Sequence, residues 1–100
     1  MIFSLYSVYD MVAQQYARPF CAVNDATAVR SFADEVNSPS DSVLYKSSAD
    51  FQLFSLGSFN DADGAVSVFD TPKLVTSGSV VRQAAGANVV SAGGAPGRGA

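Results

Sequence analysis

The sequence predicts an α+β fold of order ββαββ, in which one helix packs on a small antiparallel sheet and a disordered C-terminal tail follows. Three observations predict it: two strand-like apolar runs near the N-terminus, one segment with helical spacing, and two further strands around an acidic turn. A chain of 100 residues, 48% of them hydrophobic, is long enough for one domain with a modest core.

The N-terminal segment predicts two paired strands. Ile2 to Tyr9 is rich in β-branched and aromatic residues, which favour strands, and Asp10 ends it. Tyr16 to Val23 reads as the partner strand. Pro19 lacks a backbone N–H, so it places this strand at a sheet edge or a bulge.

The next segment predicts the helix. Asn24 or Asp25 is a suitable N-cap, because its side-chain oxygen can accept a free backbone N–H. Apolar residues then recur at positions i, i+3, i+4 and i+7, which lie on one helical face: Val29, Phe32, Ala33 and Val36. The helix ends at Asn37-Ser38-Pro39.

A polar loop over residues 39–50 leads to a second pair of strands. Phe51 to Phe59 and Ala65 to Phe69 are the strands, and Asn60 to Gly64 is the turn between them. Gly64 closes the turn at a position suited to a positive φ angle, which glycine adopts without steric cost.

The composition divides the chain near Pro72. Residues 1–72 hold all nine acidic residues and three basic ones, a formal charge of −6, whereas residues 73–100 hold the other three basic residues, +3. Six of the eight glycines lie in the second segment. We therefore expect a folded domain over 1–72 and a basic, flexible tail over 73–100, disordered from 84 onward; residues 74–83 could add an edge strand.

The missing residue types argue against catalysis. Without histidine the chain has no Ser-His-Asp or Cys-His site, and its single cysteine, Cys21, excludes a disulfide within the chain and a cysteine-rich zinc site. The Asp61-x-Asp63-Gly64 segment resembles a calcium loop, but its flanking strands and incomplete ligand spacing favour a hairpin turn. We expect no enzyme activity, no metal and no cofactor.

The first residues lack the pattern of a signal peptide, and no apolar run approaches the length of a membrane span. We expect a soluble protein of a reducing cytoplasm with no membrane partner.

Aromatic residues on the predicted strands raise the possibility of single-stranded nucleic acid binding, since such proteins stack bases on aromatic side chains of a sheet. Most of these rings are expected in the core, because the folded part is acidic and phosphates require cations. Tyrosines suit partly exposed positions, and the tail supplies positive charge. The candidate nucleic-acid-binding residues are Tyr6, Tyr9, Tyr16, Lys73, Arg82 and Arg98.

Three segments together resemble a known family. They are Tyr6-Ser7-Val8-Tyr9-Asp10, the helical segment Asn24 to Phe32 with its A-x-R-x-F pattern, and Ala49 to Phe59 with the D-F-x-L-F-x-L-G-x-F pattern. In this order they resemble the small non-structural protein of gokushovirus-type microviruses, which are single-stranded DNA bacteriophages. The similarity spans roughly residues 3–70.

The resemblance implies a DNA-binding or replication-associated protein in the host bacterial cytoplasm. We therefore expect a non-enzymatic phage accessory protein that binds single-stranded DNA. The alternative is an acidic protein–protein interaction module, a partner of the replication initiator or a homo-oligomer, with no direct DNA contact. A minor component of the virion is a third hypothesis.

Overall fold

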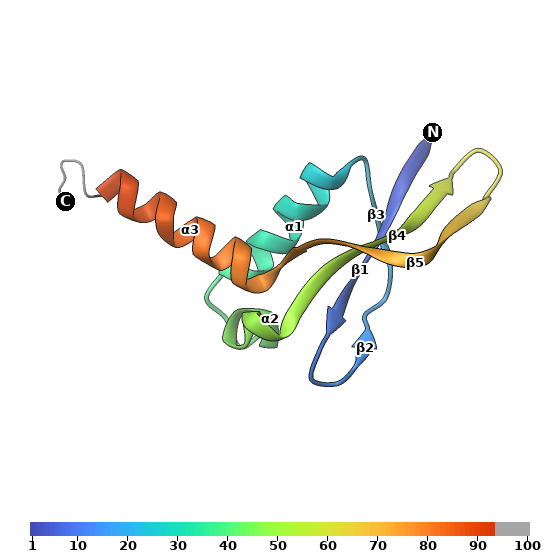
Figure 1. Cartoon of the computed structure of the whole chain (residues 1–100). Coiled ribbons are helices and arrows are strands. Elements are labelled where there is room, and N and C mark those ends of the chain that lie inside the picture. Colours follow the sequence, from blue (N-terminus) through green and yellow to red (C-terminus); the bar gives the residue numbers. More distant parts are fainter. Residues whose placement is uncertain (94–100) are drawn as a thin grey trace.

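The computed structural model describes the backbone of residues 1–93 and the side chains of residues 1–85. It contains one antiparallel sheet with helices packed against one of its faces (Figure 1), which confirms the predicted α+β class. In chain order the elements are β1 (Ile2–Asp10), β2 (Gln15–Tyr16), β3 (Phe20–Ala22), α1 (Asp25–Asn37), α2 (Val43–Lys46), the 3-10 helix η1 (Ser48–Asp50), β4 (Phe51–Asn60), β5 (Val66–Ser77) and α3 (Gly78–Gly93).

The sheet is built around the pair β1 and β4. The strand order is β2-β1-β4-β5, and β3 also pairs with β1, beside β2. The β1–β4 ladder runs from Ile2 opposite Asn60 to Asp10 opposite Phe51. Two strands from opposite halves of the folded region thus form the centre of the sheet.

The predicted partner strand over Tyr16–Val23 is two short strands, β2 and β3. Tyr16 pairs with Tyr9, and Cys21 pairs with Leu5, but the residues between them leave the ladder. Pro19 explains the break, because it has no N–H to donate to β1.

Helix α1 follows the prediction closely. Its N-cap is Asn24, whose Oδ1 accepts the backbone N–H of Thr27 at 2.9 Å. Phe32 and Val36 of the predicted apolar face are buried together with Ala28, and Val29 and Ala33 pack at the margin of the core. The buried face therefore differs slightly from the predicted one, because it includes Ala28 and leaves Val29 and Ala33 only partly buried.

The segment predicted as a polar loop contains the two short helices α2 and η1. The Ser42 hydroxyl accepts the N–H of Leu44 at 3.2 Å and caps α2, so that Leu44 packs against the core. One helical turn is too short to produce a periodic apolar pattern, which is why the sequence did not reveal it.

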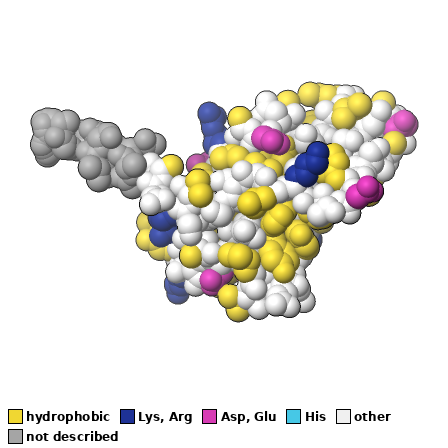
Figure 2. All heavy atoms as spheres, viewed as in Figure 1, with side chains coloured by type: hydrophobic (Ala, Val, Ile, Leu, Met, Phe, Trp, Pro, Cys, Tyr) yellow, Lys and Arg dark blue, Asp and Glu magenta, His cyan; other side chains and the backbone are white. Residues whose placement is uncertain are grey.

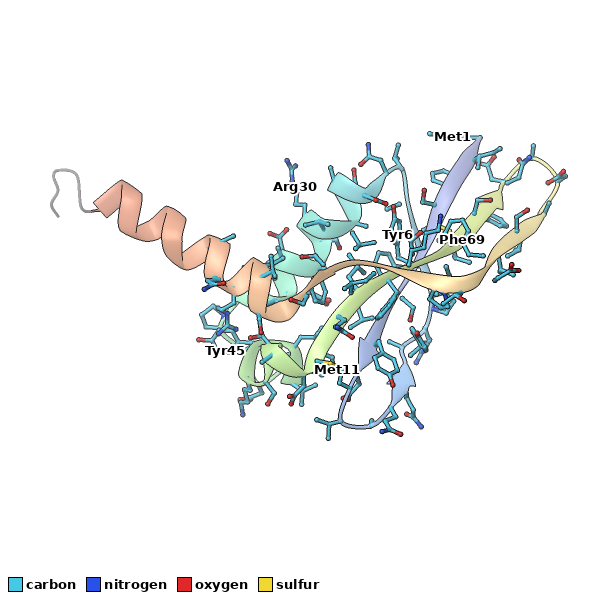
Figure 3. The ribbon with its side chains drawn as sticks, in the orientation of Figure 1. Met1, Tyr6, Met11, Arg30, Tyr45 and Phe69 are labelled. Carbon is cyan, nitrogen blue, oxygen red and sulfur yellow. The ribbon has the colours of Figure 1, made fainter. Side chains whose placement is uncertain are left out.

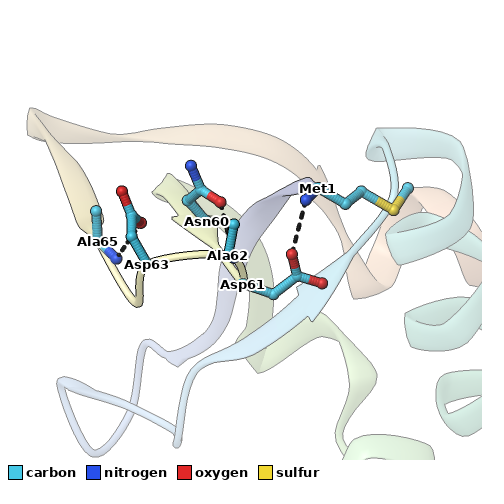
Figure 4. A network of polar contacts seen from close by, with 6 residues as sticks. All are labelled: Met1, Asn60, Asp61, Ala62, Asp63 and Ala65. Carbon is cyan, nitrogen blue, oxygen red and sulfur yellow. Dashed lines mark hydrogen bonds and ion pairs between the residues drawn. The ribbon is translucent and has the colours of Figure 1, made fainter.

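The hairpin between β4 and β5 has the predicted turn. Gly64 has a φ of 75°, and its N–H donates to the Asn60 carbonyl at 2.8 Å. Figure 4 shows the contacts of the two carboxylates in this turn. Asp63 accepts the backbone N–H of Ala65, and Asp61 forms an ion pair with the amino group of Met1 at 2.7 Å. The N-terminus is thereby held beside the hairpin.

The core joins one face of the sheet to all three helices. Its fully buried side chains include Tyr6 from β1, Leu53 from β4 and Val36 from α1. Leu44 of α2 packs at its margin, and Val81 of α3 is 7% exposed within it. The chain must therefore extend at least to residue 81 to complete this core.

The predicted domain boundary at 72 is wrong. Strand β5 continues through Pro72 and Lys73 to Ser77, whose hydroxyl accepts the N–H of Val80 at 3.2 Å and caps α3. The glycine content suggested a tail, but Gly78 is needed for packing: a Cβ there would lie 1.9 Å from the Ser48 carbonyl oxygen. Residues 73–85 belong to the folded domain.

The segment predicted as disordered, 84–100, begins inside α3, which leads away from the body of the molecule (Figure 1). The helix extends to Gly93, and the remainder of the predicted disorder, over 94–100, lies outside the described residues.

Arg82 connects α3 to α1 and α2 through hydrogen bonds. Its guanidinium donates to the Val36 carbonyl at 2.5 Å, to the Tyr45 carbonyl at 2.6 Å and to the Asn37 side chain at 3.1 Å. It also lies 4.7 Å from the centre of the Tyr45 ring. The last carbonyls of a helix have no partner within it, so Arg82 satisfies groups that α1 and α2 leave open.

We predict that Arg82→Ala lowers the free energy of unfolding by about 2–3 kcal/mol, because it removes several charge-assisted hydrogen bonds and leaves carbonyls unpaired. Urea denaturation followed by circular dichroism measures the change. Arg30→Ala, at an exposed position of α1, is the matched control and should change stability by less than about 0.5 kcal/mol. Equal losses in the two variants would contradict this role of Arg82.

Candidate nucleic-acid interface

Three aromatic side chains meet on the sheet and form what we call the aromatic cluster: Tyr9, Tyr16 and Phe54. The ring centres of Tyr9 and Tyr16 are 4.6 Å apart, and Phe54 lies edge-on to both, at 6.0 Å from Tyr9 and 5.7 Å from Tyr16. Such geometry is typical of favourable aromatic contacts, which fix the rings relative to one another.

Strand alternation places the cluster on the face away from the core. Tyr9 follows Val8, and Phe54 follows the fully buried Leu53, so both point to the opposite side of the sheet. The register then places Tyr16 directly opposite Tyr9. The helices that pack on Leu53 therefore leave this face open.

The cluster is accessible. Tyr16 is 46% exposed, and Tyr9 and Phe54 are half-buried. Leu74, which pairs with Phe54 across β4 and β5, is 57% exposed and extends the apolar surface. We call these four residues the aromatic face. Figure 2 shows hydrophobic side chains gathered over the strands on the side of the molecule in view.

Two cations lie near this face in the chain. Lys73, one of the predicted binding residues, is exposed next to Leu74, and its amino group lies 4.3 Å from the centre of the Phe69 ring. Arg18 is exposed in the segment between β2 and β3, two residues after Tyr16. Lys73 lies opposite Ser55, which in turn lies opposite the buried Tyr6, so strand alternation directs Lys73 to the side of the sheet away from the aromatic face. Arg18 is therefore the described cation that lies next to the cluster in the chain.

Of the predicted tyrosines, Tyr9 and Tyr16 come together, and Tyr6 does not join them. The expectation that Tyr6 (labelled in Figure 3) is partly exposed is wrong. Its side chain is fully buried on the core side and stacks on Phe20, with the ring centres 5.7 Å apart. Its hydroxyl donates to Asp25 at 2.5 Å. The hydroxyl of this buried ring therefore has a hydrogen-bond partner, as buried tyrosines usually do.

The other two cations predicted to bind nucleic acid are Arg82 and Arg98. Arg82 is engaged by carbonyl groups of α1 and α2, and Arg98 lies outside the described residues. Phe54 and Arg18 were not among the predicted site residues. Strand alternation indicates that Leu53 and Phe54 lie on opposite faces of the sheet. The sequence alone does not show which of the two faces packs on the core, so Phe54 could not be identified as a surface residue from it. Within residues 1–85, the side chains form no group of three potential metal ligands.

Burial, and then the hydrogen bond to Asp25, raise the pKa of Tyr6 above its usual value of 10.0. The folded state therefore holds this proton more tightly than the unfolded state. The resulting stability is fully present below pH 10 and is lost as pH rises through the folded-state pKa.

We predict that Tyr6→Phe costs about 1 kcal/mol of stability at neutral pH, through loss of the hydrogen bond to Asp25. Above about pH 10 the difference from wild type should narrow, because only the wild type loses the contribution of the tyrosine proton. Urea denaturation across a pH series measures both effects. Tyr16→Phe at neutral pH is the control for removing an exposed hydroxyl. Parallel pH profiles for Tyr6→Phe and wild type would contradict the prediction.

Comparison with known proteins places the chain in a phage family. A family model described as Phage ORF5 protein matches residues 3–81, which include every strand and end at the buried Val81. No curated protein and no solved structure matches the chain. Among the described residues, no helix is long and apolar enough to cross a membrane. The match covers well over half of the chain, and the protein therefore belongs to the Phage ORF5 family of bacteriophage proteins.

Proposed function

We propose that this phage accessory protein is non-enzymatic and binds single-stranded DNA in support of DNA replication inside the host bacterium, as the resemblance to microvirus proteins suggests. The observation that carries the proposal is the aromatic cluster on the open face of the sheet. Aromatic side chains on a sheet provide stacking surfaces for unpaired bases without requiring a particular sequence.

The exposure of the three rings suggests how bases would stack. Tyr16 has the most accessible ring of the three. The Tyr9 ring packs against it at a tilt, and the Phe54 ring meets it edge-on. Each base stacked on an aromatic side chain contributes about 1–3 kcal/mol by alanine substitution. One or two stacked bases would give weak binding that becomes useful where several copies line one strand.

The acidic character of the chain is concentrated on other elements. Asp34 and Glu35 lie on the outer surface of α1, and Asp61 and Asp63 lie in the hairpin turn. Asp10 lies at the end of β1 next to Tyr9, where its carboxylate accepts two backbone N–H groups of the following turn. These five carboxylates therefore do not lie on the aromatic face.

Binding should depend only modestly on salt. With Arg18 as the phosphate contact of the described residues, the logarithm of affinity should fall with the logarithm of salt concentration with a slope of about −0.7, since each contact to a single strand contributes about −0.7. The predicted contact of Arg98 would steepen the slope by about the same increment.

Fluorescence anisotropy with labelled oligo-dT tests the proposal across a salt series. We expect Tyr16→Ala to weaken binding by about tenfold and Tyr16→Phe to restore most of it, because a phenyl ring stacks as a phenol ring does. Arg18→Gln should weaken binding and lower the slope by about 0.7, and Lys73→Gln and Arg98→Gln test two of the cations predicted from the sequence in the same way.

The matched controls are Val43→Ala, at an exposed apolar position of α2, and Arg30→Gln, at an exposed cation of α1. Both should leave binding within about twofold of wild type. Absence of binding at low salt would overturn the proposal. A loss in Val43→Ala equal to that in Tyr16→Ala would show that the aromatic face is not the site.

A further inference from the structure

A second surface lies along α1, beside β3, and it differs in character from the aromatic face. An apolar hollow of about 370 Å³ lies between the two elements, lined by Phe3, Phe20, Cys21, Ala22, Val23, Thr27, Ser31 and Phe59. A neighbouring hollow of about 430 Å³ shares Phe20 and Ser31 with it and is lined further by Phe32, Asp34 and Glu35. The two hollows adjoin at these shared residues, and we call them together the α1 groove.

The α1 groove is apolar at one end and acidic at the other. Ser31 lies at the junction, and Asp34 and Glu35 follow it within about one helical turn, some 5–6 Å further along the axis. Both carboxylates are exposed, and neither forms an ion pair with the residues whose side chains are described. An occupant must therefore supply an apolar group and, close to it, positive charge.

One wall of the groove is an open sheet edge. Among the described strands, β3 pairs only with β1, so its other edge has backbone groups free to pair. Every residue of β3 lines the apolar hollow. An extended peptide could add to this edge through main-chain hydrogen bonds while its side chains fill the groove, a common mode of peptide recognition.

We propose that the α1 groove binds an extended, basic peptide segment of a partner protein, with apolar side chains in the hollow at Phe3, Phe20 and Phe59 and arginine or lysine at Asp34 and Glu35. The charge of the groove selects this partner: the two carboxylates would repel a phosphate chain and an acidic peptide. The site is separate from the aromatic face and does not rest on DNA binding.

A synthetic peptide probe tests the proposal. It has phenylalanine at its first and third positions and arginine at its fifth and seventh, with threonine, valine and glycine elsewhere, so that all four side chains project from the same side of the extended peptide and the nearest apolar and basic residues lie about 7 Å apart. A scrambled peptide of identical composition is the control. Binding of the labelled probe is followed by fluorescence anisotropy at low ionic strength.

Two variants of the groove and a matched control for each locate the binding. Asp34→Lys combined with Glu35→Lys should weaken binding by about tenfold, whereas Asp41→Lys combined with Asp70→Lys, the same charge change at exposed acids elsewhere, should leave it within about twofold. Ser31→Trp, which fills the junction from an exposed helix position, should abolish binding; Ala26→Trp, exposed on the same helix outside the groove, should not.

Cys21 provides a second measurement that does not depend on affinity alone. It is the only cysteine of the chain and lines the apolar hollow, so the rate at which iodoacetamide alkylates it reports whether the groove is occupied. Saturating probe peptide should slow alkylation by about fivefold or more, since an occupant covers the thiol. Circular dichroism confirms that each variant remains folded.

Each of the following outcomes would overturn the proposal: no binding of the probe to the wild type, equal binding of the scrambled peptide, equal losses in the two lysine pairs, or an unchanged alkylation rate at saturation. Protection of Cys21 by oligo-dT in place of the peptide would instead assign the groove to nucleic acid.

Discussion

The structure depends on the helices burying one face of the sheet. Tyr6 and Leu53 at the centre of the β1–β4 pair are fully buried because α1, α2 and α3 all pack on their side. A chain of this length has too few apolar residues to cover both faces with helices. The other face therefore carries half-exposed aromatic side chains, and this constraint creates the surface to which we assign DNA binding.

The same requirement for burial explains the end of the folded domain. The core is incomplete without Val81, and Arg82 beside it supplies hydrogen bonds to carbonyls that α1 and α2 cannot satisfy themselves. A cation that the composition assigns to a flexible, DNA-binding tail thus has a structural role. The family match, which ends at residue 81, follows this boundary and not the change in composition near Pro72.

The two proposed surfaces divide the charge of the molecule. The net charge of −3 is an average over an aromatic face with Arg18 next to it in the chain and an α1 groove that ends at Asp34 and Glu35. A protein with both could hold single-stranded DNA on one side and a basic partner on the other. The carboxylates of Asp34 and Glu35 would repel the phosphates of DNA and so keep the DNA out of the α1 groove.

The sequence by itself determined the α+β class, the Asn24 cap of α1, and the hairpin turn at Gly64, because each depends on contacts within a few residues. Tertiary structure decided the rest. The register between β1 and β4, which are some fifty residues apart, buries Tyr6 and leaves Tyr9 open to join Tyr16 and Phe54. Periodicity places residues on alternate faces, but only the packed helices determine which face is the core.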